Sequence, residues 1–196
     1  MAYERIEPWK TVIHKDHIED HDVDIDVAIG EIFSMGINED SNNNAYGSRV
    51  DLYDPAERPT LSKLHDDVIL PALLRYVQEE FGITLNDKDY RTSMWCIYSQ
   101  NNDGLDLHVH NGAQVSAVFY LIPNPGNLVL VDPRGCAGRG YEWDITKNHF
   151  ANYQITPEAD TVYVFPSYLG HYVKPSPGVM RMSIACDLFF GHPTGY

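Results

Sequence analysis

The fold of this chain is decided by residues 92–131, which read TSMWCIYSQNNDGLDLHVHNGAQVSAVFYLIPNPGNLVLV. Several segments of this stretch are rich in residues that favour β-strands, and they are separated by clusters of Asn, Asp, Gly and Pro that favour turns. Polarity in the first segment alternates with a period of two, as in a strand with one buried face. Short strands at this spacing indicate an antiparallel sandwich or barrel. We expect strands over residues 92–99, 105–110, 115–122 and 128–131.

The rest of the C-terminal half continues the pattern of short strands. Three more are expected, over residues 161–165, 171–173 and 180–190. Between the two groups, residues 132–154 contain several glycines and show no clean period. We expect a long loop there, and long loops in compact domains often act as functional lids.

The N-terminal half favours helices. Ile25, Ile29, Ile32 and Phe33 recur at helical spacing before Gly36, which predicts a helix with one face on the core. A longer helix is expected from a cap at Thr60 to Gly82, because its apolar residues follow an i, i+3, i+4 pattern. Pro71 lies inside this second helix, so a kink or break is expected at that point.

The order of elements is therefore helices first and a β-core second. We expect one domain over residues 1–196, because the chain shows no second core and its length suits one sandwich or barrel with attached helices. It divides into a helix-rich part at 1–91 that packs on the core, the β-core at 92–190 and a short tail at 191–196. The fold class is mainly β with flanking helices (α+β).

The charge of the chain excludes two classes of partner. Its formal net charge is −14 at pH 7, so its long-range field repels nucleic acids and anionic membrane surfaces. No apolar run approaches the roughly 20 residues of a membrane span, and residues 1–10 lack the apolar region of a secretory signal. We expect a cytoplasmic protein.

Two other groups of residues, a cluster of His and acidic residues and the three cysteines, are expected to have no catalytic role. Residues 14–26 are crowded with His and acidic side chains, a mixture typical of solvated surface. Cys96, Cys136 and Cys186 are too widely spaced for a disulfide framework or a C-x-x-C metal site. We expect these cysteines to be small buried or partly buried apolar residues.

The candidate chemistry begins at His108 and His110. On an extended segment these two side chains point to the same side of a sheet, where they could hold a metal ion. Asp106 falls on the same face, so periodicity alone does not choose between Asp106 and His110. A third histidine, His171, opens a later strand, and Arg181 begins the last long strand.

Taken in order, these elements resemble a known pattern. The chain contains, in this order, His108-Val109-His110, Ser116-Ala117-Val118-Phe119-Tyr120-Leu121, Gly126, Asp132-Pro133-Arg134, Phe165-Pro166-Ser167, His171 and Arg181-Met182-Ser183. The series is similar to that of iron(II)- and 2-oxoglutarate-dependent oxygenases, and closest to a small uncharacterised branch of that superfamily found in bacteria and phages. The resemblance covers residues 92–190, about half the chain, and several ordered blocks are more specific than one motif.

The resemblance implies a fold and a ligand set. The core would be a double-stranded β-helix, the cupin-like jelly-roll, and His108, His110 and His171 would ligate iron(II). Three protein ligands leave open positions for a bidentate 2-oxo acid and dioxygen. Arg181 and Ser183 would bind the distal carboxylate of 2-oxoglutarate, since Arg offers a fixed charged fork.

The third metal ligand departs from the commoner pattern of the superfamily, and the roles of two tyrosines and of Arg134 are not decided by the sequence. Most relatives carry a carboxylate where this chain has His110, which leaves Asp106 as the rival third ligand. Three neutral imidazoles would also leave the iron more positive than two imidazoles and a carboxylate. Either Tyr120 or Tyr98 could place a phenol on the co-substrate, and we favour Tyr120. Arg134 could fix a loop or line the substrate entrance, and we assign it no catalytic role.

The implied function is that of a dioxygenase that hydroxylates an unidentified small-molecule or protein substrate, while 2-oxoglutarate is converted to succinate and carbon dioxide. Two alternatives remain. The first is a cupin-like three-histidine metalloenzyme that uses no 2-oxoglutarate, against which Arg181 and Ser183 argue. The second is a noncatalytic jelly-roll module with a binding or structural role, because a fold does not determine a function.

Overall fold

A computed structural model describes residues 10–18, 20–36, 38–39, 46–47, 51–100, 103–175 and 178–191. The first nine residues and nearly all of the expected tail lie outside these ranges. No helix in the described part of the chain is long and apolar enough to cross a membrane.

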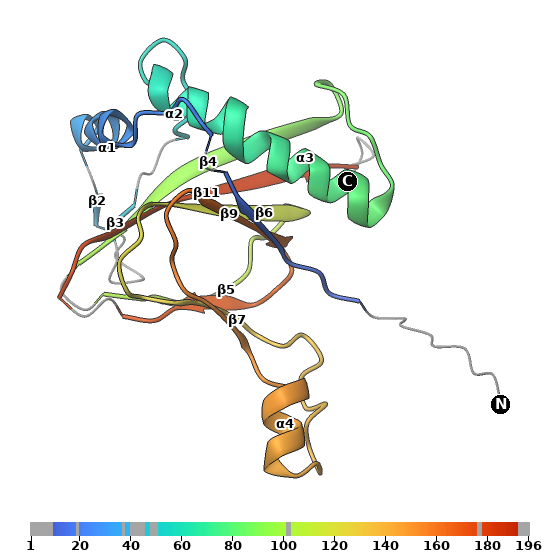
Figure 1. Ribbon diagram of the computed structural model, residues 1–196. Helices are drawn as coiled ribbons and strands as arrows, with labels where there is room; N and C mark the ends of the chain where they lie inside the picture. Colours follow the sequence, from blue (N-terminus) through green and yellow to red (C-terminus); the bar gives the residue numbers. More distant parts are fainter. Residues whose placement is uncertain are drawn as a thin grey trace.

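The molecule is built on two antiparallel sheets (Figure 1). The larger sheet has seven strands in the order β1-β9-β6-β11-β4-β3-β2, and the smaller has four in the order β5-β10-β7-β8. Their bounds are β1 His14–His17, β2 Asn38–Glu39, β3 Tyr46–Gly47, β4 Tyr90–Ser99, β5 Leu105–His108, β6 Val115–Ile122, β7 Leu128–Leu130, β8 Tyr153–Ile155, β9 Thr161–Pro166, β10 His171–Val173 and β11 Arg181–Phe190. The expected mainly-β jelly-roll is confirmed.

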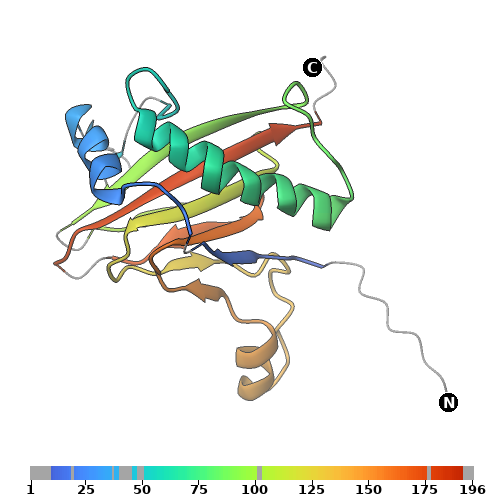
Figure 2. The ribbon, with the colours of Figure 1, turned by 45° about the horizontal axis from the view of Figure 1, so that its top comes forward.

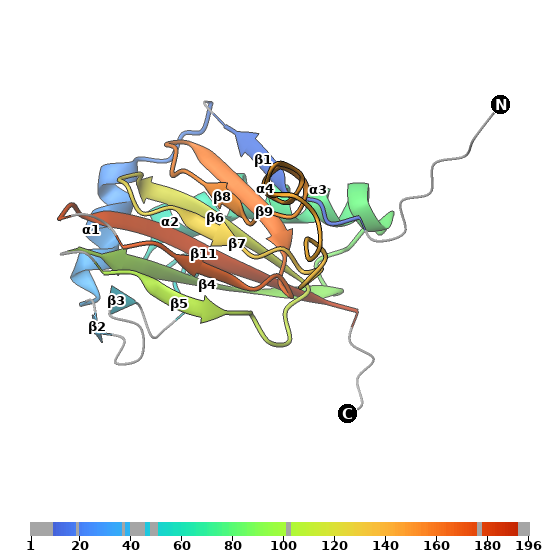
Figure 3. The same cartoon turned by 90° about the horizontal axis from the view of Figure 1, so that it is seen from below.

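The two faces of the larger sheet bury different groups. Because side chains alternate along a strand, odd and even positions of β11 face opposite ways. Met182, Ile184 and Cys186 join the apolar cluster on the helical side. Arg181, Ser183 and Ala185 instead line a cavity together with residues of the smaller sheet. Figure 3 shows the smaller sheet from below, with β5 and β7 in front of the larger one.

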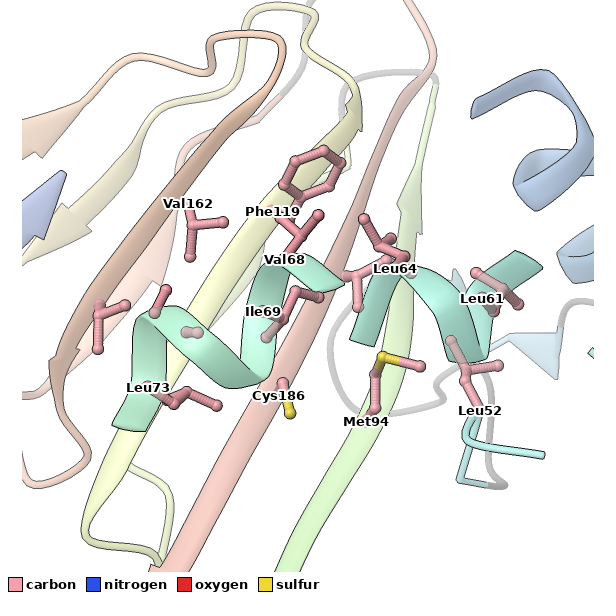
Figure 4. Close-up of a cluster of buried hydrophobic side chains, with 14 of the residues drawn as sticks. Leu52, Leu61, Leu64, Val68, Ile69, Leu73, Met94, Phe119, Val162 and Cys186 are labelled. Atoms are coloured by element: carbon pink, nitrogen blue, oxygen red, sulfur yellow. The ribbon is translucent and has the colours of Figure 1, made fainter. Parts of the chain in front are cut away.

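Helices cover the outer face of the larger sheet. They are α1 (Ile25–Ser34), α2 (Pro59–Leu64), a π-helical turn η1 (His65–Ile69) and α3 (Leu70–Phe81). In Figure 2 the helix formed by α2, η1 and α3 crosses above the strands. Leu64, Val68 and Leu73 are fully buried in the cluster that it forms with the sheet (Figure 4). The apolar pattern of the sequence therefore marks the covered face correctly.

Pro71 interrupts the regular helix, as expected. The turn before it is π-helical, and the N–H of Leu70 donates to the carbonyl of His65, five residues back. Pro71 has no N–H and its ring clashes with a regular preceding turn, so a wider turn before it relieves both problems. The α-helix resumes and ends at Gly82, whose φ of 67° suits glycine in the left-handed region.

The expected cap at Thr60 is wrong. The helix begins at Pro59, and its first N–H groups are bound by a side chain from α1. Glu31 accepts from the backbone N–H groups of Thr60 and Leu61, each at 2.9 Å. A carboxylate at a helix N-terminus satisfies groups that have no partner inside the helix and interacts favourably with the helix dipole. This contact ties α1 to α2.

We expect Glu31→Ala to lower the free energy of unfolding by about 1–2 kcal/mol, because it leaves two helix N–H groups without their acceptor. Urea unfolding followed by circular dichroism measures the change. Glu57→Ala is a matched control, because Glu57 is exposed and precedes the same helix. An equal loss in both variants would contradict the capping role.

The structure corrects three further expectations. Residues 14–17, expected as solvated surface, form the edge strand β1 beside β9, so the N-terminal part supplies strands as well as helices. Residues 132–154 are not one irregular loop, since they contain α4 (Trp143–His149) and end in β8. Cys96 and Cys186 are buried as expected, but Cys136 is exposed.

Candidate functional site

Three histidines from distant parts of the sequence meet at one place. His108 and His171 are paired in register on the adjacent strands β5 and β10. The expected strand included His110, but β5 ends at His108. Strand alternation therefore does not determine where the His110 side chain points. Its backbone N–H donates to the carbonyl of Ser167 at 3.2 Å. The candidate ligand atoms of the three side chains all lie within 4.8 Å of one another.

Each of these histidines has one ring nitrogen already engaged. Nδ1 of His108 lies 2.7 Å from the carbonyl of Asp106, and Nδ1 of His171 lies 2.8 Å from that of Leu169. Nδ1 of His110 lies 2.7 Å from Oδ1 of Asp187. Carbonyl and carboxylate oxygens only accept, so each Nδ1 carries the proton and Nε2 keeps a lone pair. Metal-bound histidines have this arrangement, with the second ring nitrogen donating to an outer acceptor.

Burial keeps two of the rings in the form that binds metals. Burial lowers the pKa of His108, and it lowers the pKa of His171 to about 4. A neutral imidazole is the ligand form, whereas a protonated one has no lone pair to offer. At neutral pH His171 is therefore ready to ligate.

Asp106, the rival third ligand, does not join this group. Asp106 is exposed, and it contacts Nδ1 of His108 through its backbone carbonyl. The geometry of the described residues thus favours His110 for the third position.

A cavity of about 250 Å³ is lined by the three histidines and by residues at the start of β11. Its polar lining beyond the histidines includes Arg181 and Ser183, while Trp95 and several apolar side chains form the rest of its wall. Pockets for drug-sized ligands are larger, about 300–1,000 Å³. The volume suits a small molecule.

Arg181 is almost fully buried, although it carries a charge. Its Nη1 donates to the carbonyl of Gly126 at 2.9 Å, but Nε and Nη2 have no hydrogen-bond partner among the described residues. Burial lowers the pKa of this guanidinium, yet an arginine stays charged in proteins. A buried cation with unused donors is costly unless an anion binds to it. An anion bound in the cavity would satisfy these donors.

The two tyrosines considered for this position lie on different sides of the larger sheet. Tyr120 is buried on the cavity side, beside Ser183 in the register of β6 and β11, and its hydroxyl has no partner among the described residues. Tyr98 packs on the helical side, where its ring lies 6.1 Å from that of Phe33. Tyr98 is therefore not placed at the cavity.

Arg134 stabilises the segment that contains α4. Its guanidinium pairs with Asp132 and lies over the ring of Phe150 at 4.8 Å. α4 projects away from the smaller sheet (Figure 1) and none of its residues is buried. Within the described part of the chain, no residue of 132–154 lines the cavity, so the structure does not support the expected lid.

Asp187 also belongs to this site and was not predicted from the sequence. Its carboxylate contacts His110, and the hydroxyl of Ser116 donates to the same oxygen at 2.6 Å. A signal was present, because Asp187 shares the parity of Arg181 and Ser183 on one strand and so faces the same way.

Comparisons with known proteins agree with this geometry. Residues 93–187 match a family model described as "Putative 2OG-Fe(II) oxygenase". None of the curated proteins compared with the chain matches it.

Solved structures share the fold at low sequence identity. A prolyl-4-hydroxylase from Pseudomonas putida is 14% identical, with a TM-score of 0.62 over 92% of this chain and 93% of that one. A Trichoplax adhaerens prolyl hydroxylase, solved with a peptide fragment of hypoxia inducible factor, is 15% identical, with a TM-score of 0.64 over 91% and 83%.

HygX from Streptomyces hygroscopicus, solved with nickel, 2-oxoglutarate and hygromycin B, is 14% identical, with a TM-score of 0.63 over 95% and 84%. At these identities the likeness shows the fold, while the family match covers the three histidines, Arg181 and Ser183. Residues 93–187 of this chain, just under half of its length, are therefore similar to the 2OG-Fe(II) oxygenase family.

Proposed function

We propose that this protein is an iron(II)- and 2-oxoglutarate-dependent dioxygenase that hydroxylates its substrate, with His108, His110 and His171 as the metal ligands. The observation that carries the proposal is the pairing of three inward histidines, each held through Nδ1, with a buried arginine that has unused donors in the same cavity. Three nitrogen ligands on one side of an ion leave positions open for other ligands.

Arg181 is proposed to bind the distal carboxylate of 2-oxoglutarate. Its unpartnered Nε and Nη2 are adjacent donors of the guanidinium fork, which matches a carboxylate in a bidentate pair. Ser183 lines the same cavity and Tyr120 is its cross-strand neighbour, so their hydroxyls would donate to the same anion. These residues would bind and orient the co-substrate with its oxo-acid end toward the histidines.

The apolar part of the cavity wall would exclude water from the metal. Leu105, Leu128 and Phe165 line it, and a dry site strengthens electrostatic interactions and limits side reactions. When bound, the iron, 2-oxoglutarate and dioxygen supply the oxidising chemistry, which yields succinate, carbon dioxide and a hydroxylated product.

The substrate is proposed to be a small molecule or a protein side chain. Structural neighbours were solved with a peptide fragment in one case and with hygromycin B in another. The neighbours also include an epimerase, SnoN, so the reaction outcome needs its own measurement. Hydroxylation is the outcome that we propose.

Anaerobic reconstitution tests the proposed function. We expect protein loaded with Fe²⁺ and 2-oxoglutarate to form succinate when air is admitted, slowly without substrate and faster with it. Succinate is quantified by mass spectrometry, and protein without Fe²⁺ is the control. If Fe²⁺ binds but 2-oxoglutarate neither binds nor reacts, the three-histidine metalloenzyme without 2-oxoglutarate is the better explanation. If neither binds, the noncatalytic module is.

A further inference from the structure

The three histidines differ in what their Nδ1 groups contact. His108 and His171 donate to backbone carbonyls, which are neutral. His110 alone donates to a carboxylate, that of Asp187, at 2.7 Å. A carboxylate thus lies directly behind one of the three candidate ligands.

The protein holds this carboxylate in a fixed and almost dry position. Asp187 is 5% exposed, and Ser116 and Ser167 are fully buried. The Ser116 hydroxyl donates to Asp187 at 2.6 Å and lies 2.8 Å from the hydroxyl of Ser167. Among the ion pairs of the described residues, Asp187 is joined to no lysine or arginine, only to His110. The serines orient the carboxylate but do not neutralise its charge.

A buried carboxylate without a cationic partner is unfavourable, whereas one that faces a metal ion through an imidazole is stabilised by the charge of that ion. The same contact makes the imidazole a more basic ligand and fixes its ring and tautomer. On the basis of the proposed metal site, we propose that Asp187 is a positioning residue that supplies negative charge to the metal centre through His110. The centre then resembles two imidazoles and a carboxylate in charge, while its ligand atoms are three nitrogens.

Two substitutions separate charge from hydrogen bonding. Asp187→Asn keeps the size and an acceptor oxygen for His110 but removes the charge. Ser116→Ala removes a neutral neighbour of the same network and keeps the carboxylate. Calorimetric titration with Ni²⁺, which is not oxidised by air, measures the metal affinity of wild type and both variants. Thermal melts without metal check that each variant is folded.

We expect Asp187→Asn to weaken Ni²⁺ binding by about 10–100-fold, as removal of an outer partner of a metal-bound histidine typically does. Ser116→Ala should change the affinity by less than about threefold, because the charge remains. Equal affinities for wild type and Asp187→Asn would overturn the proposal, and so would an equal loss in both variants. If wild type binds no Ni²⁺ at all, the proposed function fails with it.

A measurement on the wild type keeps the proposal testable if Asp187→Asn does not fold. In protein loaded with diamagnetic Zn²⁺, proton NMR observes the Nδ1–H groups of the three rings. His108 is an internal reference, since its Nδ1 is also 2.7 Å from its acceptor but that acceptor is neutral. We expect the His110 signal farther downfield, because hydrogen bonds to charged acceptors are stronger. Coincident His108 and His110 signals would overturn the proposal.

Discussion

Replacing His171 with alanine is expected to abolish metal binding. His171 is the most buried of the three histidines, and its Nδ1 donates to the carbonyl of Leu169. Because its pKa is lowered to about 4, it offers a neutral ring throughout the pH range of ordinary assays. Two remaining imidazoles cannot provide the three-ligand face that a stable site needs. Loss of this ligand should cost more affinity than loss of an outer partner, so more than about 100-fold.

Calorimetric titration with Ni²⁺ under the conditions used for wild type measures this loss. His149→Ala is the matched control, because His149 is exposed on α4 and lies outside the group of three. It should bind Ni²⁺ as wild type does. If His171→Ala retained wild-type affinity while remaining folded, the metal site would have to lie elsewhere.

The second large effect is expected at Arg181. Arg181→Met keeps a long apolar stem and removes the guanidinium, so Ni²⁺ should still bind while 2-oxoglutarate does not. Two charge-assisted hydrogen bonds to a carboxylate contribute about 3–5 kcal/mol together, which corresponds to roughly 10²–10⁴-fold in affinity. Calorimetric titration of the Ni²⁺-loaded protein with 2-oxoglutarate measures the loss.

The same substitution should not destabilise the protein without ligand. In wild type the buried guanidinium has two nitrogens without partners among the described residues, and this uncompensated burial opposes folding. We expect the melting temperature of Arg181→Met without ligand to equal or exceed that of wild type, and the stabilisation by 2-oxoglutarate to be absent. Thermal melts with and without 2-oxoglutarate measure both quantities.

Arg91→Met is the control for this pair of measurements. Arg91 is exposed on β4 and stacks on Phe189, outside the cavity. It should retain the affinity for 2-oxoglutarate. Unchanged 2-oxoglutarate binding in Arg181→Met would contradict the co-substrate assignment, and the cavity would then serve another ligand.

Local patterns in the sequence predicted most elements of this fold. The strands β4, β6 and β11 follow from polarity alternation and from runs of β-branched and aromatic residues, and the helix that ends at Gly82 follows from its apolar spacing. These signals are local, because each depends only on which side of one element faces apolar surroundings. The order of His108, His171, Arg181 and Ser183 along the chain carried the family resemblance.

Long-range pairing decided what local patterns could not. Residues 14–17 carry a polar pattern, yet β9 offers an edge whose backbone groups they satisfy. The cap of α2 is likewise a side chain, Glu31, from another helix. β9 and Glu31 lie far from these segments in the sequence, so patterns within a few residues do not reveal either contact.

The sequence by itself indicated the jelly-roll class, through the family resemblance, and the order of the candidate ligands along the chain. Only the tertiary structure separated His110 from Asp106, placed Tyr98 on the helical side and brought Asp187 to His110. The physical reason is that strand periodicity assigns a face and not a neighbour. His110 lies past the end of β5, where alternation no longer holds, and it contacts Asp187, which lies 77 positions later in the chain on β11.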